Sequence, residues 1–217
     1  MSSLLWEAKL GRTVLLTRNL APGKKVYNEE LIIKGGVEYR TWDPFRSKLA
    51  AAMIKGLPTD IIGEGSKVLY LGASTGTTAS HVSDIVGPSG IVIGVEFAPR
   101  VAREFVERVA RERRNVIPFV ADARDPSKYS VGRVDVVYCD IAQPDQTEIA
   151  LLNCRTMLKK GGTLLLVVKS QSIDVSKDPA VVYKEERGKL TEASLTVKGF
   201  YELSPFEKHH AMIYAQS

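Results

Sequence analysis

The sequence predicts an α/β fold in which a doubly wound, mostly parallel sheet follows a small N-terminal β module. From residue 67 onward, short apolar runs alternate with helical patterns, which is typical of a parallel sheet covered by helices. Earlier, the short apolar pieces 13–16 and 31–33 are separated by the turn sequences A-P-G and G-G. We therefore expect a β module over residues 1–41 and a main domain over residues 42–217.

Five apolar runs of the main domain are predicted to be parallel strands, at residues 68–71, 91–95, 116–120, 134–139 and 163–168. Helical patterns occupy residues 77–86, 100–114, 146–158 and 179–193. Two last runs, 199–203 and 211–215, are expected to pair as an antiparallel edge, which makes a seven-stranded sheet whose last strand is antiparallel. Before the sheet, Asp43 and Pro44 predict a helix over residues 45–55, capped by Asp43.

The composition is that of a globular protein with a modest positive charge. Of 217 residues, 44% are hydrophobic, enough for one substantial core. The net charge of +5 is compatible with a phosphate-rich partner but does not require one. Cys139 and Cys154 form no disulfide framework or metal motif, so we expect a reducing compartment and no metal. No run approaches the roughly 20 apolar residues of a membrane span, and residues 1–9 lack signal-peptide features, so a cytoplasmic protein is expected.

A glycine-containing turn follows the first parallel strand, in the stretch K-V-L-Y-L-G-A-S-T-G-T-T at residues 67–78. A strand that passes through Gly72 and Gly76 into a helix brings backbone amides close to a ligand. The G-x-x-x-G spacing lacks the second glycine of the dinucleotide fingerprint, which holds a pyrophosphate. A cofactor without a pyrophosphate fits better, and S-adenosylmethionine is the common one. The plainer alternative is a turn that binds nothing, with Thr77 and Thr78 merely capping the helix.

Polar residues follow the next two strands, at the sheet edge where α/β proteins bind ligands. Glu96 ends the second strand, where its carboxylate can accept hydrogen bonds from both hydroxyls of a ribose. Asp122 follows the third strand, where it can accept from an adenine amino group, and Phe97 can stack on the adenine. The alternative for each acid is an ordinary solvated loop residue.

Four more polar side chains are expected at this same edge. Asp140 follows the fourth strand, Lys169 follows the fifth, and His210 precedes the antiparallel strand that begins there. The helix before the first strand runs antiparallel to it, so Lys48 in its N-terminal turn also points to this edge. Such a group suits methyl transfer to a hydroxyl, which must be oriented and deprotonated, because two ammonium groups stabilise the developing alkoxide.

Each of these four residues also has a purely structural interpretation. Lys48 and Lys169 can be solvated, Asp140 can cap a turn, and His210, like His209, can be an ordinary surface residue. The sequence does not decide which of the two lysines acts as the base.

The quoted stretches as a whole resemble the fibrillarin family, in its short archaeal-type form. The matching segments are W-D-P-F-R-S-K-L-A-A-A at 42–52, V-L-Y-L-G-A-S-T-G-T-T at 68–78, S-H-V-S-D-I-V-G at 80–87, G-V-E-F-A-P-R at 94–100, D-I-A-Q-P at 140–144, V-K-S-Q-S-I-D-V at 168–175 and E-K-H-H-A at 207–211. The resemblance covers nearly the whole length. It implies a Rossmann-like methyltransferase fold and the transfer of a methyl group from S-adenosylmethionine to ribose 2′-hydroxyls of rRNA and possibly tRNA.

The resemblance also implies roles for individual residues. It makes Lys48, Asp140, Lys169 and His210 a catalytic group, with His210 selected because alanine follows it. The cofactor contacts that it implies are Ala73, Thr77, Thr78, Glu96, Phe97, Asp122, Ala123 and Gln143. Gly72 and Gly76 of the turn and Asp140 complete the set of residues expected to bind the cofactor.

Fibrillarins act within a ribonucleoprotein, so the resemblance implies several partners. They are a box C/D guide RNA, the substrate RNA, a Nop-domain scaffold protein and a kink-turn-binding L7Ae-like protein. The glycine-arginine-rich tail of nucleolar fibrillarins is not found in this sequence. Three alternatives stay open: a non-catalytic subunit of the particle, a protein-glutamine methyltransferase, and a dehydrogenase, which the missing glycine disfavours.

Overall fold

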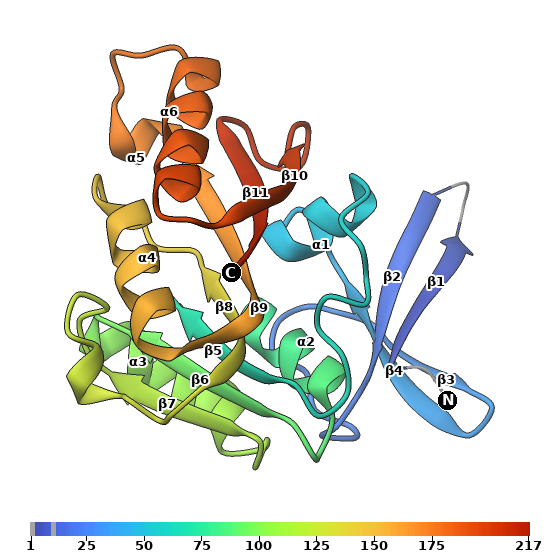
Figure 1. Cartoon of the computed structure of the whole chain (residues 1–217). Coiled ribbons are helices and arrows are strands. Elements are labelled where there is room, and N and C mark those ends of the chain that lie inside the picture. Colours follow the sequence, from blue (N-terminus) through green and yellow to red (C-terminus); the bar gives the residue numbers. More distant parts are fainter. Residues whose placement is uncertain (1–2, 10–11) are drawn as a thin grey trace.

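The structure, a computed structural model, describes residues 3–9 and 12–217 and contains two β-sheets with the helices packed around the larger one (Figure 1). The larger sheet has seven strands in the order β10-β11-β9-β8-β5-β6-β7. Its strands are β5 (Lys67–Leu71), β6 (Ile91–Glu96), β7 (Val116–Val120), β8 (Val134–Cys139), β9 (Leu158–Lys169), β10 (Thr196–Glu202) and β11 (His210–Gln216).

The strand directions agree with those predicted from the sequence. Strands β5 to β9 pair in parallel, whereas β11 pairs antiparallel with both β9 and β10. The predicted seven-stranded, mostly parallel fold is therefore confirmed. Strand β9 begins five residues earlier than expected, at Leu158 rather than residue 163, after an irregular pairing with β8.

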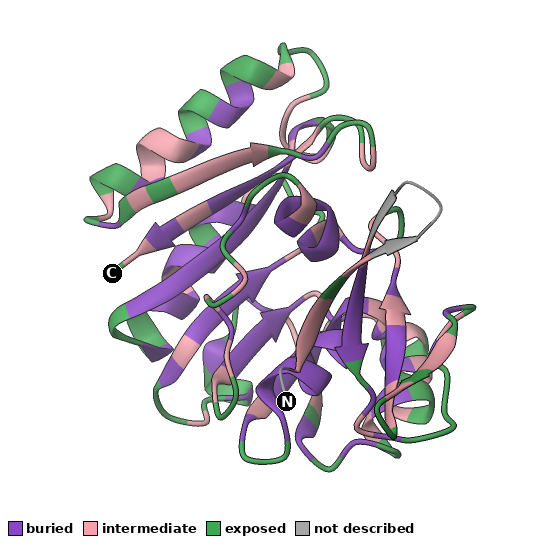
Figure 2. Ribbon diagram, turned by 90° about the vertical axis from the view of Figure 1, so that its right-hand side faces the viewer, coloured by how far each residue is buried: buried purple, intermediate pink, exposed green. Residues whose placement is uncertain are grey.

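Alternating side chains of the central strands enter two hydrophobic cores, one on each face of the sheet. Val68 and Tyr70 pack on one face with α1 (Lys48–Ile54), α2 (Thr77–Val86) and Phe105 of α3 (Pro99–Phe105). Leu69 and Leu71 pack on the other with α4 (Gln146–Met157) and α6 (Pro179–Glu192). Figure 2 shows the resulting buried sheet and the exposed outer face of the covering helices.

The helix before the first parallel strand starts later than predicted. It begins at Lys48, with Ser47 as its N-cap, and not at residue 45 with Asp43 as its cap. The Asp43 side chain instead accepts a hydrogen bond from the Phe45 amide at 2.9 Å, and its carbonyl accepts one from Arg46 at 3.1 Å. Asp43 therefore forms a local turn, which competes with the helix for the same amides.

The predicted helix over residues 100–114 is also divided. The α-helical part, α3, ends at Phe105 and continues as a π-helical turn, η1 (Val106–Ala110). A Cβ atom at Gly76 would approach the Phe105 ring to 2.6 Å, so this stretch packs directly on the start of α2. The remaining short elements are the 3-10 turn η2 (Pro126–Lys128) and α5 (Ser170–Ile173).

The N-terminal strands form the smaller, antiparallel sheet in the order β1-β2-β4-β3. They are β1 (Leu4–Lys9), β2 (Arg12–Arg18), β3 (Leu31–Lys34) and β4 (Val37–Trp42). In Figure 1, α1 lies between this sheet and β11. The expected β module is therefore present as a sheet, while its separation from the main domain at residue 41 stays a prediction.

A buried ionic network joins the smaller sheet to α2. Arg40 of β4 contacts Glu29 at 2.7 Å and Asp84 of α2 at 2.8 Å, and all three side chains are fully buried. Arg113 and Thr17 also donate to Asp84, at 3.1 and 2.9 Å. Because buried charges need partners, this network fixes the smaller sheet against the helix. Within the described residues, no helix is both long enough and apolar enough to cross a membrane.

Candidate active site

A cavity of about 310 Å³ opens at the carboxyl ends of the parallel strands. Its lining comes from the ends of β5, β6, β7, β8 and β9 and from the loops that follow them. The lining residues are Gly72, Ser74, Val95, Glu96, Phe97, Ala121, Asp122, Ala123, Arg124, Asp140, Ile141, Ala142, Gln143, Ile149 and Lys169. This is the place and the size at which α/β proteins bind small ligands.

Gly72, directly after β5, allows the ends of β5 and β8 to lie close together under the cavity. Its φ angle is +81°, and a Cβ atom added there would lie 2.8 Å from the Asp140 carbonyl oxygen. Only glycine adopts this conformation without strain and leaves room for the Asp140 backbone. The glycine thus shapes the cavity and brings Asp140 to its rim.

Glu96 bridges two loops of the cavity wall. Its carboxylate accepts hydrogen bonds from the Ser74 amide at 2.9 Å and the Ala98 amide at 3.0 Å. Each carboxylate oxygen has a second lone pair, so the group can still accept hydrogen bonds from a ligand. Phe97 beside it is 69% exposed, so its ring is available for stacking.

Arg124 closes the opposite wall of the cavity. Its guanidinium lies 3.5 Å from Asp122 and 2.6 Å from Asp145, and it donates to Gln143 at 3.2 Å. Arg124 was not predicted from the sequence, because a single arginine in a loop carries no signal of its own. Its only pointer was its position two residues after Asp122.

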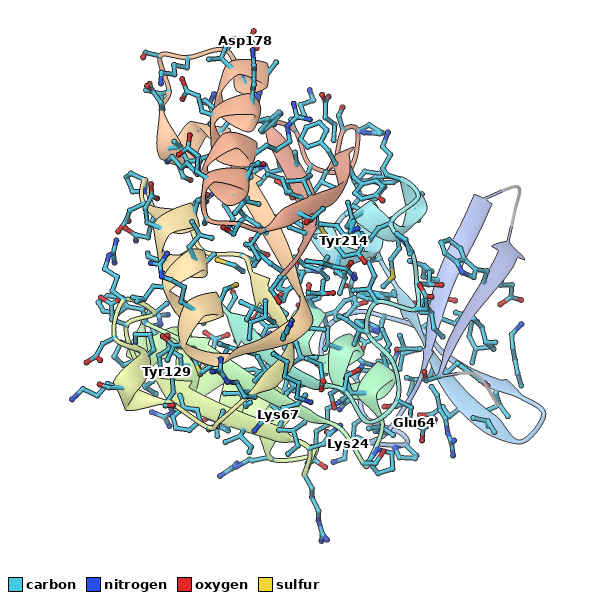
Figure 3. All side chains as sticks on the ribbon, in the orientation of Figure 1. Lys24, Glu64, Lys67, Tyr129, Asp178 and Tyr214 are labelled. Atoms are coloured by element: carbon cyan, nitrogen blue, oxygen red, sulfur yellow. The ribbon has the colours of Figure 1, made fainter. Side chains whose placement is uncertain are left out.

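The buried Tyr129 holds the loop that forms this wall. The hydroxyl of Tyr129, labelled in Figure 3, lies 2.7 Å from Asn153 Oδ1 and 3.0 Å from the Ala123 carbonyl oxygen, and its one proton is shared between these two acceptors. Asn153 in turn donates to the Ala123 carbonyl at 2.9 Å. The loop that carries Asp122 and Ala123 is therefore held firmly against α4.

Two lysines converge on Asp140 at the rim of the cavity. Lys48 Nζ lies 3.4 Å from Asp140 Oδ2, and Lys169 Nζ lies 2.8 Å from Asp140 Oδ1. Lys169 also donates to the Asp140 carbonyl at 2.9 Å. All three side chains are only partly buried, which leaves the ammonium groups accessible to a substrate.

His210 joins this group through the sheet, because its backbone pairs with Lys169 across β11 and β9. Its Nδ1 atom lies 2.7 Å from the Lys208 carbonyl. A carbonyl oxygen can only accept, so Nδ1 carries the proton and, in the neutral ring, Nε2 carries the lone pair.

The surroundings of His210 favour its neutral form. Burial lowers the pKa of the imidazole, and the positive charges of Lys48 and Lys169 lower it further. The Lys208 carbonyl and Glu207, 3.8 Å from Nδ1, oppose this shift in pKa. The balance is a pKa below the usual value of 6.5, so the ring is a free base at neutral pH.

The backbone before His210 adopts a constrained conformation. His209 has a φ angle of +60°, and its carbonyl accepts hydrogen bonds from the Ser170 amide at 3.2 Å and hydroxyl at 3.0 Å. Ser170 follows Lys169 directly, so one segment positions both the lysine and the histidine. Ser170 and Lys208 lie within motifs already noted in the sequence, but nothing there indicated these backbone contacts.

The predicted cofactor residues divide into two groups. Seven of them line the cavity: Gly72, Glu96, Phe97, Asp122, Ala123, Asp140 and Gln143. The other four, Ala73, Gly76, Thr77 and Thr78, lie outside the lining, at the turn and the start of α2. Neither threonine is the helix cap, which is Gly76, and Thr78 is buried and donates to Ser47 at 2.9 Å.

Comparison with known sequences identifies the family. The chain matches the family model described as Fibrillarin over residues 4–217. It is 54% identical to a fibrillarin-like rRNA/tRNA 2′-O-methyltransferase of Sulfolobus acidocaldarius over 205 residues, which are 94% of this chain and 88% of the relative. It is 48% identical to the protein of the same name from Aeropyrum pernix over 211 residues, 96% of this chain and 90% of that one.

Solved structures show the same fold. The Methanococcus jannaschii fibrillarin pre-rRNA processing protein has a TM-score of 0.92 and 42% identity, over 100% of this chain and 98% of that chain. Aeropyrum pernix fibrillarin, in complex with natively bound S-adenosyl-L-methionine, has a TM-score of 0.87 and 44% identity, over 99% and 100%. A chain of a fibrillarin/Nop5p complex has a TM-score of 0.84 and 35% identity, over 99% and 97%. With matches that span nearly its whole length, the chain belongs to the fibrillarin family.

Proposed function

We propose that the protein transfers a methyl group from S-adenosylmethionine to ribose 2′-hydroxyls of rRNA and tRNA, as the catalytic subunit of a box C/D guide ribonucleoprotein. The observation that carries this proposal is the position of Asp140, which is ion-paired with Lys48 and Lys169 at the cavity rim beside His210. The relatives named rRNA/tRNA 2′-O-methyltransferases support the reaction. The A. pernix structure with natively bound S-adenosyl-L-methionine supports the cofactor.

The cavity has the donors and acceptors that S-adenosylmethionine requires. Glu96 would accept hydrogen bonds from the ribose hydroxyls of the cofactor, Asp122 would accept from the adenine amino group, and Phe97 would stack on the adenine. Gly72 and Asp140, which pack closely together, both line the cavity and would contact the amino-acid portion. When bound, the cofactor supplies a methyl group activated by a positively charged sulfur.

The polar group at the rim prepares the hydroxyl of the substrate. The Nζ atoms of Lys48 and Lys169 lie 3.4 and 2.8 Å from Asp140, so the two ammonium groups would place positive charge beside the hydroxyl oxygen. His210 presents the free lone pair of Nε2, and we assign to it the role of base that the sequence left between the two lysines. His210 would take the hydroxyl proton on Nε2 while the oxygen takes the methyl group, and the sulfur would leave as a neutral thioether with the electron pair of its bond to the methyl carbon. The imidazolium would then lose its proton to water.

The partners follow from the family and from one complex. The fibrillarin/Nop5p structure supports a Nop-domain scaffold protein as a direct partner. We extend the proposal to a box C/D guide RNA, which selects the nucleotide, and to an L7Ae-like protein that binds the kink-turn of this RNA. The basic pI, near 9.1, is compatible with such an RNA-rich assembly.

Two measurements test this function. Calorimetry on the isolated protein should detect binding of S-adenosylmethionine and no binding of NAD. In a particle reconstituted with the scaffold protein, the L7Ae-like protein and a guide RNA, the methylated nucleotide should change when the guide sequence changes. Cofactor binding without methyl transfer in the complete particle would instead identify a non-catalytic subunit, and methylation of a protein glutamine would replace the proposed substrate.

A further inference from the structure

An exposed aromatic pair lies beside the proposed catalytic group. Phe45, in the turn before α1, is 59% exposed, an unusual position for a large apolar side chain. Its ring packs edge-on against Phe206, with ring centroids 5.2 Å apart and an interplanar angle of 70°. Phe206 itself packs against the hydrophobic core, so it supports Phe45 from below.

The pair adjoins the catalytic group because both are carried by the same two segments. Phe45 precedes Lys48 by three residues, and Phe206 precedes His210 by four. The two segments meet through the aromatic rings. They also converge on Asp140 and Lys169, since Lys48 and Lys169 both pair with Asp140 and the backbone of His210 pairs with Lys169. The exposed face of Phe45 is therefore next to the side of the group formed by Lys48 and His210.

This is the side from which the substrate must approach. Asp140 and Lys169 line the cofactor cavity, whereas Lys48 and His210 lie outside its lining. Methyl transfer by displacement requires the attacking oxygen and the leaving sulfur on opposite sides of the methyl carbon. With the cofactor in the cavity, the ribose would therefore have to lie towards Lys48 and His210.

The charges around the pair suit RNA. Arg46 and Lys208, one from each segment, are exposed, and the Arg46 guanidinium lies over the Tyr27 ring at 5.6 Å from its centroid. An exposed aromatic ring flanked by cations is the usual arrangement for stacking a nucleobase while binding phosphates.

We propose that Phe45, supported by Phe206, stacks on a nucleobase of the substrate RNA next to the nucleotide that is methylated. This inference rests on the proposed function, since it takes the substrate to be RNA. The contact orients the ribose without taking part in the chemistry, so Phe45 is a positioning residue.

The test compares variants of Phe45 in the reconstituted particle. Phe45→Ala and Phe45→Leu should both lower kcat/KM for the substrate RNA about tenfold, as expected for the loss of one base stack. Phe45→Trp should retain the activity, because its ring also stacks. The affinity for S-adenosylmethionine should be unchanged in all three variants. Val181→Ala, which alters an exposed apolar residue of α6, is the matched control and should retain the wild-type kcat/KM.

A direct measurement of contact accompanies the kinetics. Substrate RNA with 5-iodouridine on either side of the methylated nucleotide should crosslink to Phe45 under ultraviolet light, and the crosslink should disappear in Phe45→Leu. Full activity of Phe45→Leu would contradict the stacking, and loss of the scaffold protein from Phe45→Ala would show a protein-docking face instead. A wild-type particle that transfers no methyl group would overturn the proposed function itself, and with it this inference.

Discussion

His210 is held in one tautomer by a single backbone carbonyl, and this contact has a consequence for the pH dependence of the reaction. The ring is active as a base only when neutral. Because burial and two lysines lower its pKa below 6.5, it stays neutral at physiological pH and gains a proton only in more acidic solution. The single-turnover rate in the particle should therefore be constant near pH 7 and fall on the acidic side, with an apparent pKa below 6.5.

Glu207 offers a matched variant for this pH profile. Its carboxylate raises the pKa of His210. In Glu207→Gln, the fall of the rate on the acidic side of the pH profile, its acidic limb, should therefore occur at a still lower pH. His210→Gln should lower the rate and remove the limb altogether. An acidic limb that is unchanged in His210→Gln would show that another group titrates and would refute the assigned base.

Asp84 of α2 is the residue through which the buried ionic network joins the smaller sheet to the rest of the molecule. Removing its carboxylate in Asp84→Ala leaves Arg40 and Arg113, both fully buried, without this counter-charge. Breaking a buried pair of this kind costs about 3–5 kcal/mol, because the remaining charges stay desolvated. Urea denaturation should show a loss of this size in the free energy of unfolding.

Arg103→Ala, which removes an exposed ion pair, is the control for Asp84→Ala, which removes a buried one. Arg103 of α3 pairs with Glu107 of η1 at 3.0 Å on the surface, where both side chains are solvated. Its removal should change the free energy of unfolding by less than about 0.5 kcal/mol. Equal effects of the two substitutions would contradict the structural role given to the buried network.

The elements differ in how well the sequence predicted them. Strands β7 and β8 and helix α2 have the predicted limits, because apolar periodicity and turn residues mark both ends. The predicted start of α1 was wrong, because Asp43 forms a local turn instead of capping the helix. Ser47 is the cap, and it accepts a hydrogen bond from Thr78, a residue of another helix. The π-helical turn in residues 106–110 likewise reflects packing on Gly76, a contact that the local sequence does not specify.

Across the whole molecule, topology brought distant residues together as the sequence indicated. Lys48 and Asp140 are 92 positions apart and are ion-paired, because helix α1 begins, and strand β8 ends, at one edge of the sheet. What the sequence could not provide was the orientation of side chains and backbone groups. The Lys208 carbonyl that orients His210 and the contacts of Arg124 depend on loop conformation, which has no period or spacing to read.

The division of the molecule at residue 41 stays a prediction. The ionic network crosses this boundary, since Arg40 and Glu29 of the N-terminal part contact Asp84 of the main domain or each other. Few contacts cross the boundary between two domains that are joined by a flexible linker, whereas the buried ion pair of Arg40 with Asp84 and the buried hydrogen bond of Thr17 with Asp84 both cross this one. The smaller sheet and the methyltransferase part are therefore expected to unfold together.

In the proposed function, one polar group at the sheet edge performs methyl transfer to RNA, and Asp140 is the residue that both lysines of this group contact. The most direct test is single-turnover methylation of a guided substrate RNA by particles that contain wild-type protein or Asp140→Ala. Asp140→Ala should abolish methylation while the thermal unfolding and the assembly of the particle remain close to wild type. Methylation by Asp140→Ala at the wild-type rate would refute the proposed role of this polar group.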